Sequence, residues 1–287
     1  MSVSIHPFFD SSTSTFSYVV HAADDARCAI VDSVMGFELR SGTTSTDQVQ
    51  RIARFVERQG LHVEWLLETH VHADHLSGAA WLRDRVGGRI GISERIVDVQ
   101  KIFKQSFNLE DAFLADGSDF DYLFKPDERF SIGNLDAVAM SVPGHTPADV
   151  AYKMGDEAVF VGDTLFMPDV GTARCDFPGG DAGRLFDSVR RILALNPETK
   201  LYMCHDYPPA TREAQFFSDV ATQREANIHL RDGVDAADFI KMRTTRDAGL
   251  SLPKLFFPSI QINIRAGHFP QPEGNGMRYL KLPIDQF

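Results

Sequence analysis

Short runs of branched and aromatic residues occur along the chain, separated by polar turns, and this pattern is typical of β-strands. Near the N-terminus, residues 16–21 and 28–34 form two such runs, with a polar turn over 22–27 between them. We therefore expect a sheet early in the chain. Four further strands are predicted, over 63–67, 135–142, 158–161 and 201–204.

One segment between these strands repeats its apolar residues at helical spacing. Val49, Ile52 and Val56 fall on one face of a helix. Ser45, followed three residues later by Gln48, resembles a capping box, in which two side chains accept from backbone N–H groups at a helix start. The pattern predicts an amphipathic helix that begins next to Ser45.

Two more helices are predicted, over 75–86 and around 185–193. Strands that alternate with helices indicate a mixed α/β architecture. In such proteins the loops beyond the strand ends are where functional sites assemble. Four predicted strands run directly into polar residues suited to such a site: His70, His145, Asp163 and His205.

The composition is that of an ordinary globular protein. The 287 residues are 43% hydrophobic and 24% charged, which is sufficient for a large core. The formal net charge of -11 argues against nucleic acid as a partner, because phosphate backbones are bound by basic surfaces. No secretory leader and no apolar run of roughly 18 residues is present, so we expect no membrane partner. Three widely spaced cysteines suit a reducing compartment, and a cytoplasmic location is expected.

Histidines are concentrated in one place. His70, His72 and His75 share a short segment with Asp74. Packing these ionisable groups so closely is unfavourable unless a cation uses their lone pairs. We therefore predict a metal site, which the strand-end residues would complete: His145, Asp163 and His205. Imidazole and carboxylate ligands suit zinc, iron and manganese alike, so the residues alone leave the metal open.

Residues 69–75 read T-H-V-H-A-D-H, which resembles the T-H-x-H-x-D-H signature of the metallo-β-lactamase superfamily. The isolated histidines and aspartate named above match the rest of that pattern. The resemblance covers about residues 16–265 and implies an αββα sandwich of two mixed β-sheets flanked by helices. It also implies one catalytic domain over 1–287, with a C-terminal extension from about residue 211.

Three motifs resemble the persulfide dioxygenase family, the relatives of the human ethylmalonic encephalopathy protein. Residues 68–83 read E-T-H-V-H-A-D-H-L-S-G-A-A-W-L-R, and residues 205–207 read H-D-Y. Residues 171–177 read G-T-A-R-C-D-F, similar to that family's G-x-x-R-x-D-F. The resemblance implies oxidation of glutathione persulfide by O2 to sulfite and free thiol, a reaction of sulfur metabolism and sulfide detoxification.

The same resemblance implies how the site residues divide. One Fe(2+) per chain would be held by His70, His145 and Asp163, which leave coordination positions open for the substrate sulfur and O2. The other members of the cluster would orient these ligands or hold a second metal: His72, Asp74, His75 and His205.

Substrate binding calls for local cations, because glutathione carries two carboxylates and the protein as a whole is acidic. We expect Arg174 and Arg265 to bind the substrate, and Tyr207 to donate a hydrogen bond near the metal. Tyr207, Arg174 and Asp74 are the expected catalytic residues. Cys175 is a weaker candidate for a nucleophile, against a role in packing.

Two other functions fit the residues. A dinuclear zinc thioester hydrolase of glyoxalase II type would hold two Zn(2+) per chain and would use bound hydroxide. The resemblance implies His70, His72 and His145 on one zinc, with Asp163 bridging to a zinc on the remaining three: Asp74, His75 and His205. The other function is a metal-binding or redox-sensing module without turnover. A homodimer would help to bury the apolar surface that 22 phenylalanines imply.

Overall fold

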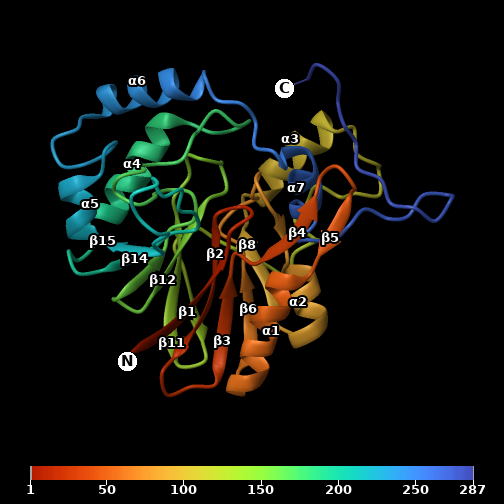
Figure 1. The fold of residues 1–287 in the computed structure, drawn as a ribbon, viewed down its shortest axis with the longest axis horizontal. Coiled ribbons are helices and arrows are strands. Elements are labelled where there is room, and N and C mark those ends of the chain that lie inside the picture. The colour runs from red at the N-terminus through yellow and green to blue at the C-terminus, as the bar shows by residue number, and fades with distance from the viewer. Residues whose placement is uncertain (1, 287) are drawn as a thin grey trace.

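The structure, a computed structural model, describes residues 2–286. Two mixed β-sheets lie face to face in the middle of the molecule, and helices cover the outer face of each sheet (Figure 1). This is the αββα sandwich expected from the sequence, so the predicted fold class is confirmed. Among the described residues, no helix combines the length and apolar character needed to cross a bilayer.

The first sheet has six strands in the order β1-β2-β3-β6-β8-β9. The strands β3, β6, β8 and β9 run parallel to one another, so their carboxyl ends meet at one edge of the sheet. Antiparallel pairing adds β2 and then β1 beside β3. The bounds are Val3–Asp10 for β1, Thr15–Ala22 for β2, Arg27–Val31 for β3, His62–Leu67 for β6, Arg89–Ser93 for β8 and Tyr122–Phe124 for β9.

The second sheet also has six strands, in the order β10-β11-β12-β13-β14-β15. All its neighbours pair antiparallel except β13 and β14, which are parallel. The turns after β13 and β14 therefore leave the sheet at the same edge. The bounds are Glu128–Ile132 for β10, Leu135–Ser141 for β11, Val150–Met154 for β12, Ala158–Phe160 for β13, Lys200–Tyr202 for β14 and Phe217–Asp219 for β15.

Seven helices and a small third sheet complete the described residues. Helices α4, α5 and α6 lie on the side of the second sheet, and α1, α2, α3 and α7 lie on the side of the first (Figure 1). The helices are α1 (Asp47–Gln59), α2 (Ala79–Val86), α3 (Ile96–Ser106), α4 (Ala182–Leu193), α5 (Val220–Ala226), α6 (Ala236–Asp247) and α7 (Phe256–Asn263). The third sheet is ordered β5-β4-β7, with β4 at Val34–Glu38, β5 at Thr43–Ser45 and β7 at Leu76–Ser77.

The core is built by the alternation of side chains along the strands. In β2, Tyr18 and Val20 point between the two sheets, whereas Val19 packs under the helices on the outer face. The same alternation in β11 places Ala139 between the sheets and Met140 under α4. Three apolar layers result, which is the packing that an αββα sandwich requires.

The predicted capping box at the start of α1 is wrong. The helix begins after Thr46, whose side chain makes no capping hydrogen bond. The Gln48 side chain instead donates to the carbonyl of Phe8 in β1, 2.9 Å away. The Gln48 side chain therefore makes a tertiary contact with a distant strand instead of the capping contact that the local pattern predicted. The end of α1 at Gly60 is a left-handed cap with φ of 65°.

The helix predicted to start at His75 begins only at Ala79. Leu76 and Ser77 are extended instead, because they form β7 and pair with β4. Gly78 joins this strand to the helix in a tight space, since a Cβ atom there would lie 2.2 Å from Cγ1 of Val49. His75 is therefore held in a loop rather than on a helix face.

Candidate metal centre

Four strand ends bring the predicted ligands to one edge of the sandwich. The loop after β6 carries the histidine motif, and the turns after β11, β13 and β14 supply the isolated residues. All of these side chains are buried except Asp74, which is partly exposed. The structure thus brings together all seven residues that the sequence predicted: His70, His72, Asp74, His75, His145, Asp163 and His205.

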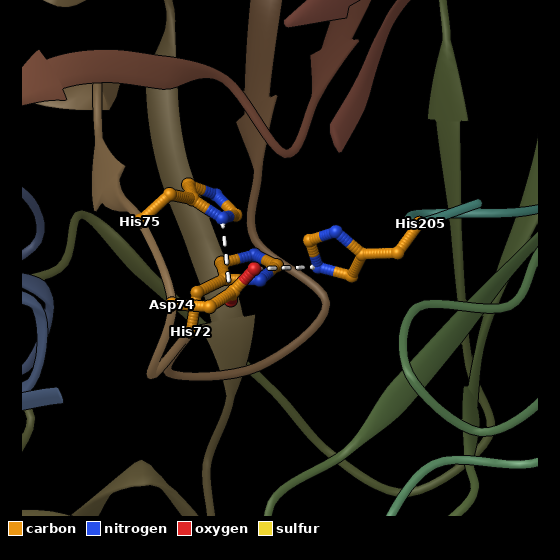
Figure 2. Close-up of side chains that lie close together, drawn as sticks. All are labelled: His72, Asp74, His75 and His205. Carbon is orange, nitrogen blue, oxygen red and sulfur yellow. Dashed lines mark ion pairs between the residues drawn. The ribbon is translucent and has the colours of Figure 1, made fainter. Parts of the chain in front are cut away.

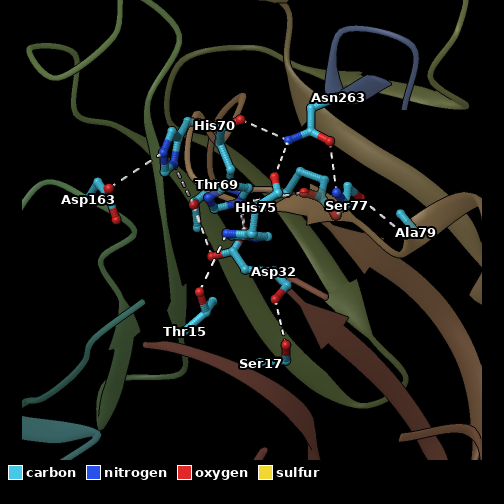
Figure 3. Close-up of polar contacts among 12 residues, drawn as sticks. Thr15, Ser17, Asp32, Thr69, His70, His75, Ser77, Ala79, Asp163 and Asn263 are labelled. Atoms are coloured by element: carbon cyan, nitrogen blue, oxygen red, sulfur yellow. Dashed lines mark hydrogen bonds and ion pairs between the residues drawn. The ribbon is translucent and has the colours of Figure 1, made fainter. Parts of the chain in front are cut away.

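The first of two ligand sets consists of His70, His145 and Asp163. One ligand atom from each lies within 4.8 Å of the others. The Nε2 atoms of His70 and His145 lie 3.8 Å and 3.7 Å from the same carboxylate oxygen, Oδ2 of Asp163. Figure 3 shows His70 facing Asp163 across this gap. Two imidazoles and one carboxylate therefore converge on one point.

The second set consists of His72, Asp74, His75 and His205, again within 4.8 Å of one another (Figure 2). Asp74 lies at its centre, because its Oδ1 is 3.5 Å from Nδ1 of His75 and its Oδ2 is 3.4 Å from Nε2 of His205. His205 Nε2 is also 3.4 Å from Oδ1 of Asp163, which joins the two sets. His72 lies between the two sets, because its ring centre is 4.1 Å from that of His70 and 4.2 Å from that of His75.

The unpartnered atoms of these residues fit bound cations. Six buried nitrogen or oxygen atoms of the two sets have no hydrogen-bond partner within the described residues: His70 Nε2, His72 Nδ1, His75 Nε2, His205 Nε2, Asp74 Oδ2 and Asp163 Oδ1. Buried polar atoms are rarely left without a partner in native proteins. Burial also lowers the pKa of His70 and His72, so both rings are neutral and their lone pairs are free for a metal.

Three of the imidazoles are held through their other nitrogen. Nδ1 of His70 lies 3.0 Å from Oγ1 of Thr69, and Nε2 of His72 lies 3.1 Å from Oδ1 of Asp32. Nδ1 of His205 lies 3.2 Å from the hydroxyl of Thr15. Such contacts orient a ligating ring and select the nitrogen that faces the metal.

The loop after β6 is also fixed from the C-terminal part of the chain. The side-chain amide of Asn263, at the end of α7, donates to the carbonyls of His72 and His75 at 2.8 Å each. Its oxygen accepts from the backbone N–H of Ser77 at 2.7 Å (Figure 3). The segment expected as an extension from about residue 211 therefore shapes the centre itself.

His145 is held by the loop that carries Arg174. Nδ1 of His145 donates to the backbone carbonyl of Arg174 at 2.6 Å, which leaves Nε2 as the nitrogen near Asp163. This loop is anchored to α6, because the carboxylate of Asp247 accepts from the backbone N–H of Cys175 at 2.9 Å. Arg243, itself paired with Asp247, donates to the carbonyl of Thr172 at 3.1 Å. A buried ion pair on α6 therefore positions the loop behind His145.

Cys175 has a packing role in this loop. Its side chain is buried, and its Sγ lies 3.5 Å from the Asp247 carboxylate. Burial and that negative charge raise the pKa of the thiol to about 12. A nucleophilic cysteine needs the opposite surroundings, a lowered pKa next to a cation, so this environment favours the packing role of Cys175 over the nucleophile role.

A cavity of about 300 Å³ opens onto the centre, and Asp74, His145 and Asp163 are part of its wall. Tyr207 and Arg174 line it too, as the sequence predicted. The Tyr207 ring stacks on His205 with ring centres 5.7 Å apart. The Arg174 guanidinium is already engaged, because it donates to both carboxylate oxygens of Asp176 and to the carbonyl of Ser251.

The structure does not place Arg265 at this cavity. Arg265 lines a different and larger cavity of about 790 Å³, where it pairs with Glu110 at 2.6 Å and lies over the Phe113 ring. This placement gives no support to the expectation that Arg265 binds the substrate of the metal centre. The residue lies at the end of α7, and its position depends on how that helix packs.

The cavity also contains residues that sequence reasoning missed. His229, Arg243 and Arg246 contribute to its wall, although no motif surrounds them in the sequence. His229 has no other histidine near it in the sequence, so no local pattern indicates a role for it. Only the packing of α6 and its preceding loop against the site shows their proximity.

Comparisons with known proteins agree with this geometry. Residues 12–205 match the metallo-beta-lactamase superfamily. The chain is 49% identical over 292 residues to a probable metallo-hydrolase of Burkholderia pseudomallei, covering 99% of each protein. It is 48% identical over 282 residues to Glyoxylase B2 of Dictyostelium discoideum, covering 98% of this chain and 97% of that one.

More distant similarity connects the chain to the persulfide dioxygenases. It is 24% identical over 252 residues to the human mitochondrial persulfide dioxygenase ETHE1, covering 87% of this chain and 82% of that one. The crystal structure of ETHE1 from Myxococcus xanthus superimposes with a TM-score of 0.72 at 26% identity, covering 92% of this chain and 99% of the other.

Proposed function

The chain belongs to the metallo-β-lactamase superfamily, and we propose that within it the protein is a persulfide dioxygenase with one Fe(2+) per chain. The observation that carries the proposal is the separate set of His70, His145 and Asp163, whose ligand atoms lie within 4.8 Å of one another. Two histidines and one carboxylate are the ligands typical of non-haem iron(II) oxygenases. The likeness to the Myxococcus xanthus structure, at 26% identity, supports the same choice.

The iron would supply open coordination positions at which a persulfide sulfur and O2 react together. In the overall reaction, glutathione persulfide, O2 and water give glutathione, sulfite and two protons, so that the outer sulfur is oxidised and O2 is reduced. The protein's own part is to orient the ligands. Thr69 and the Arg174 carbonyl hold the rings of His70 and His145, with the nitrogens near Asp163 left free.

The cavity side chains would prepare the substrate. Tyr207 presents a phenol at the cavity wall, stacked on His205, from which a hydrogen bond to the substrate or to water is available. Asp74 offers an unpartnered carboxylate oxygen in the same wall. Apolar side chains of Phe166, Val170 and Leu250 line the rest and would exclude water from the reacting sulfur.

A second candidate function is favoured by the second ligand set. His72, Asp74, His75 and His205 also lie within 4.8 Å of one another, so the chain has ligands for a second metal beside the first. Two zinc ions would support thioester hydrolysis through a bound hydroxide. The name of the Dictyostelium relative, Glyoxylase B2, points in this direction.

Metal analysis followed by two activity assays separates these functions. The protein is purified without added metal, its metal content is measured, and O2 uptake with glutathione persulfide is recorded beside cleavage of a glutathione thioester. One iron per chain with persulfide-dependent O2 uptake is the expected result. Two zinc ions with thioester cleavage would replace the proposal by the hydrolase. Retention of metal without either activity would leave a binding module.

A further inference from the structure

Three arginines line the cavity at the metal centre, and two of them are already committed to the protein. Arg174 donates to Asp176 at 2.6 Å and 2.7 Å. Arg243 is almost completely buried and pairs with Asp247 on the same helix. These two guanidinium groups hold the loop and α6 together, so neither is free to receive an anion from the substrate.

Arg246, in the last turn of α6, is different. It is exposed and lines the same cavity as Asp74, His145 and Asp163. Its guanidinium makes no hydrogen bond and no ion pair with any residue over 2–286. An arginine without a partner at the mouth of a cavity is a ready binding group for a carboxylate, which it can meet with two parallel hydrogen bonds.

His229 adds a second donor at this end of the cavity. Its Nδ1 accepts from the backbone N–H of Thr172 at 2.9 Å, so the ring proton is on Nε2. Burial, together with Arg243 and Arg246, lowers the pKa of His229 to about 4, which keeps the ring neutral at pH 7. Gly171 leaves room for the ring, since a Cβ there would lie 2.2 Å from its Nδ1.

We propose that Arg246, with His229 beside it, is the subsite that binds a carboxylate of the thiol carrying the reactive sulfur. The chain has a net charge of -11, so its overall field repels anions and a local cation must supply the attraction. The metal centre would hold the sulfur end and Arg246 the carboxylate end, with the apolar cavity wall between them. This inference rests on the proposed function only for its thiol substrate, and it applies equally to persulfide oxidation and thioester hydrolysis.

The test measures binding of glutathione to the metal-loaded protein by titration calorimetry. The variant Arg246→Gln keeps the length and polarity of the side chain but removes its charge, and we expect it to weaken binding about 10-fold. The matched control is Arg231→Gln, an exposed arginine just before α6 that does not line the cavity. The control should bind glutathione as the wild type does. Arg246→Lys should recover part of the affinity.

A second ligand separates charge recognition from a general structural effect. Glutathione with both carboxylates esterified should bind the wild type and Arg246→Gln with equal affinity. If Arg246→Gln binds glutathione as tightly as the wild type, or weakens the ester to the same degree, the proposal is overturned. Absence of glutathione binding by the wild type would also overturn it. Failure of O2 uptake alone would refute only the dioxygenase, since the binding measurement needs no turnover.

Discussion

Two cavities of the protein, one at the metal centre and one beside α2, differ in what their polar groups do. The larger, about 790 Å³, is lined by residues of α2, of the loop after α3 and of the C-terminal segment, and in it Arg265 pairs with Glu110 at 2.6 Å. The smaller, about 300 Å³, is walled in part by Asp74 and Asp163, which each keep a buried oxygen without a hydrogen-bond partner. These unpartnered atoms indicate a binding site at the smaller cavity.

In this protein, buried polar atoms without a partner therefore indicate the binding site better than cavity volume does. Burying a polar atom without a partner costs free energy, so a fold that keeps several of them together needs a ligand that repays the cost. Among the described residues that line the larger cavity, no buried side-chain nitrogen or oxygen lacks a partner. Gln261, for example, donates to the carbonyl of Lys281 at 2.8 Å and accepts from the N–H of the same residue at 2.8 Å.

The largest expected effect comes from removing the carboxylate shared by both histidines of the first set. Asp163→Ala should reduce bound iron to less than about a tenth of the wild-type content, because two imidazoles alone hold the ion weakly. Elemental analysis of the purified variant measures this. Glu110→Ala in the larger cavity is the control and should keep its iron. Equal iron in Asp163→Ala and the wild type would show that the first set is not the metal site.

An intermediate effect is expected from the anchor on α6. Asp247→Asn leaves Arg243 buried without its counter-charge and should lower the free energy of unfolding by about 3 kcal/mol. It should also weaken metal binding about 10-fold, because the loop that holds His145 loses its support. Urea unfolding and competition with a chelator measure the two quantities. Asp238→Asn, on the exposed surface of the same helix, is the control.

A double variant separates stability from positioning at this anchor. Arg243→Met combined with Asp247→Leu replaces the ion pair by apolar side chains and should recover much of the stability. The backbone N–H of Cys175 would still lack its acceptor, so the metal affinity should stay low. Recovery of both properties together would show that α6 acts on the metal only through overall stability.

The smallest effect is expected in the larger cavity. Arg265→Met removes the ion pair with Glu110 and the contact with the Phe113 ring, which should lower the free energy of unfolding by about 1 kcal/mol. The KM for the thiol substrate should change less than about twofold, since an effect on binding requires contact with the substrate. Steady-state kinetics check this. A large rise in KM would show that the substrate binds in the larger cavity, and it would contradict the assignment of substrate binding to the smaller one.

The metal ligands were predictable because each follows a strand end or belongs to the compact motif of residues 69–75. Local pattern is sufficient there, since hydrophobic periodicity locates the strands. In the second sheet, β11 and β13 both pair antiparallel with β12, and β14 pairs parallel with β13, so the ends of these three strands meet at one edge. The signature also led to the correct superfamily and fold class. The predicted strands over 16–21, 63–67 and 135–142 correspond to β2, β6 and β11.

The residue pattern was enough to predict the fold class and the side chains of the metal-binding cluster, whereas the partners of the arginines followed only from the tertiary packing. The sequence alone does not show which of Arg174, Arg246 and Arg265 has an ion-pair partner. Their partners make them different: Arg174 pairs with Asp176, Arg265 pairs with Glu110, and the Arg246 side chain makes no hydrogen bond or ion pair with a described residue. The pairing of Arg265 with Glu110 joins residues far apart in the chain, and no periodicity of the sequence predicts it, because packing decides which groups lie beside a charged side chain.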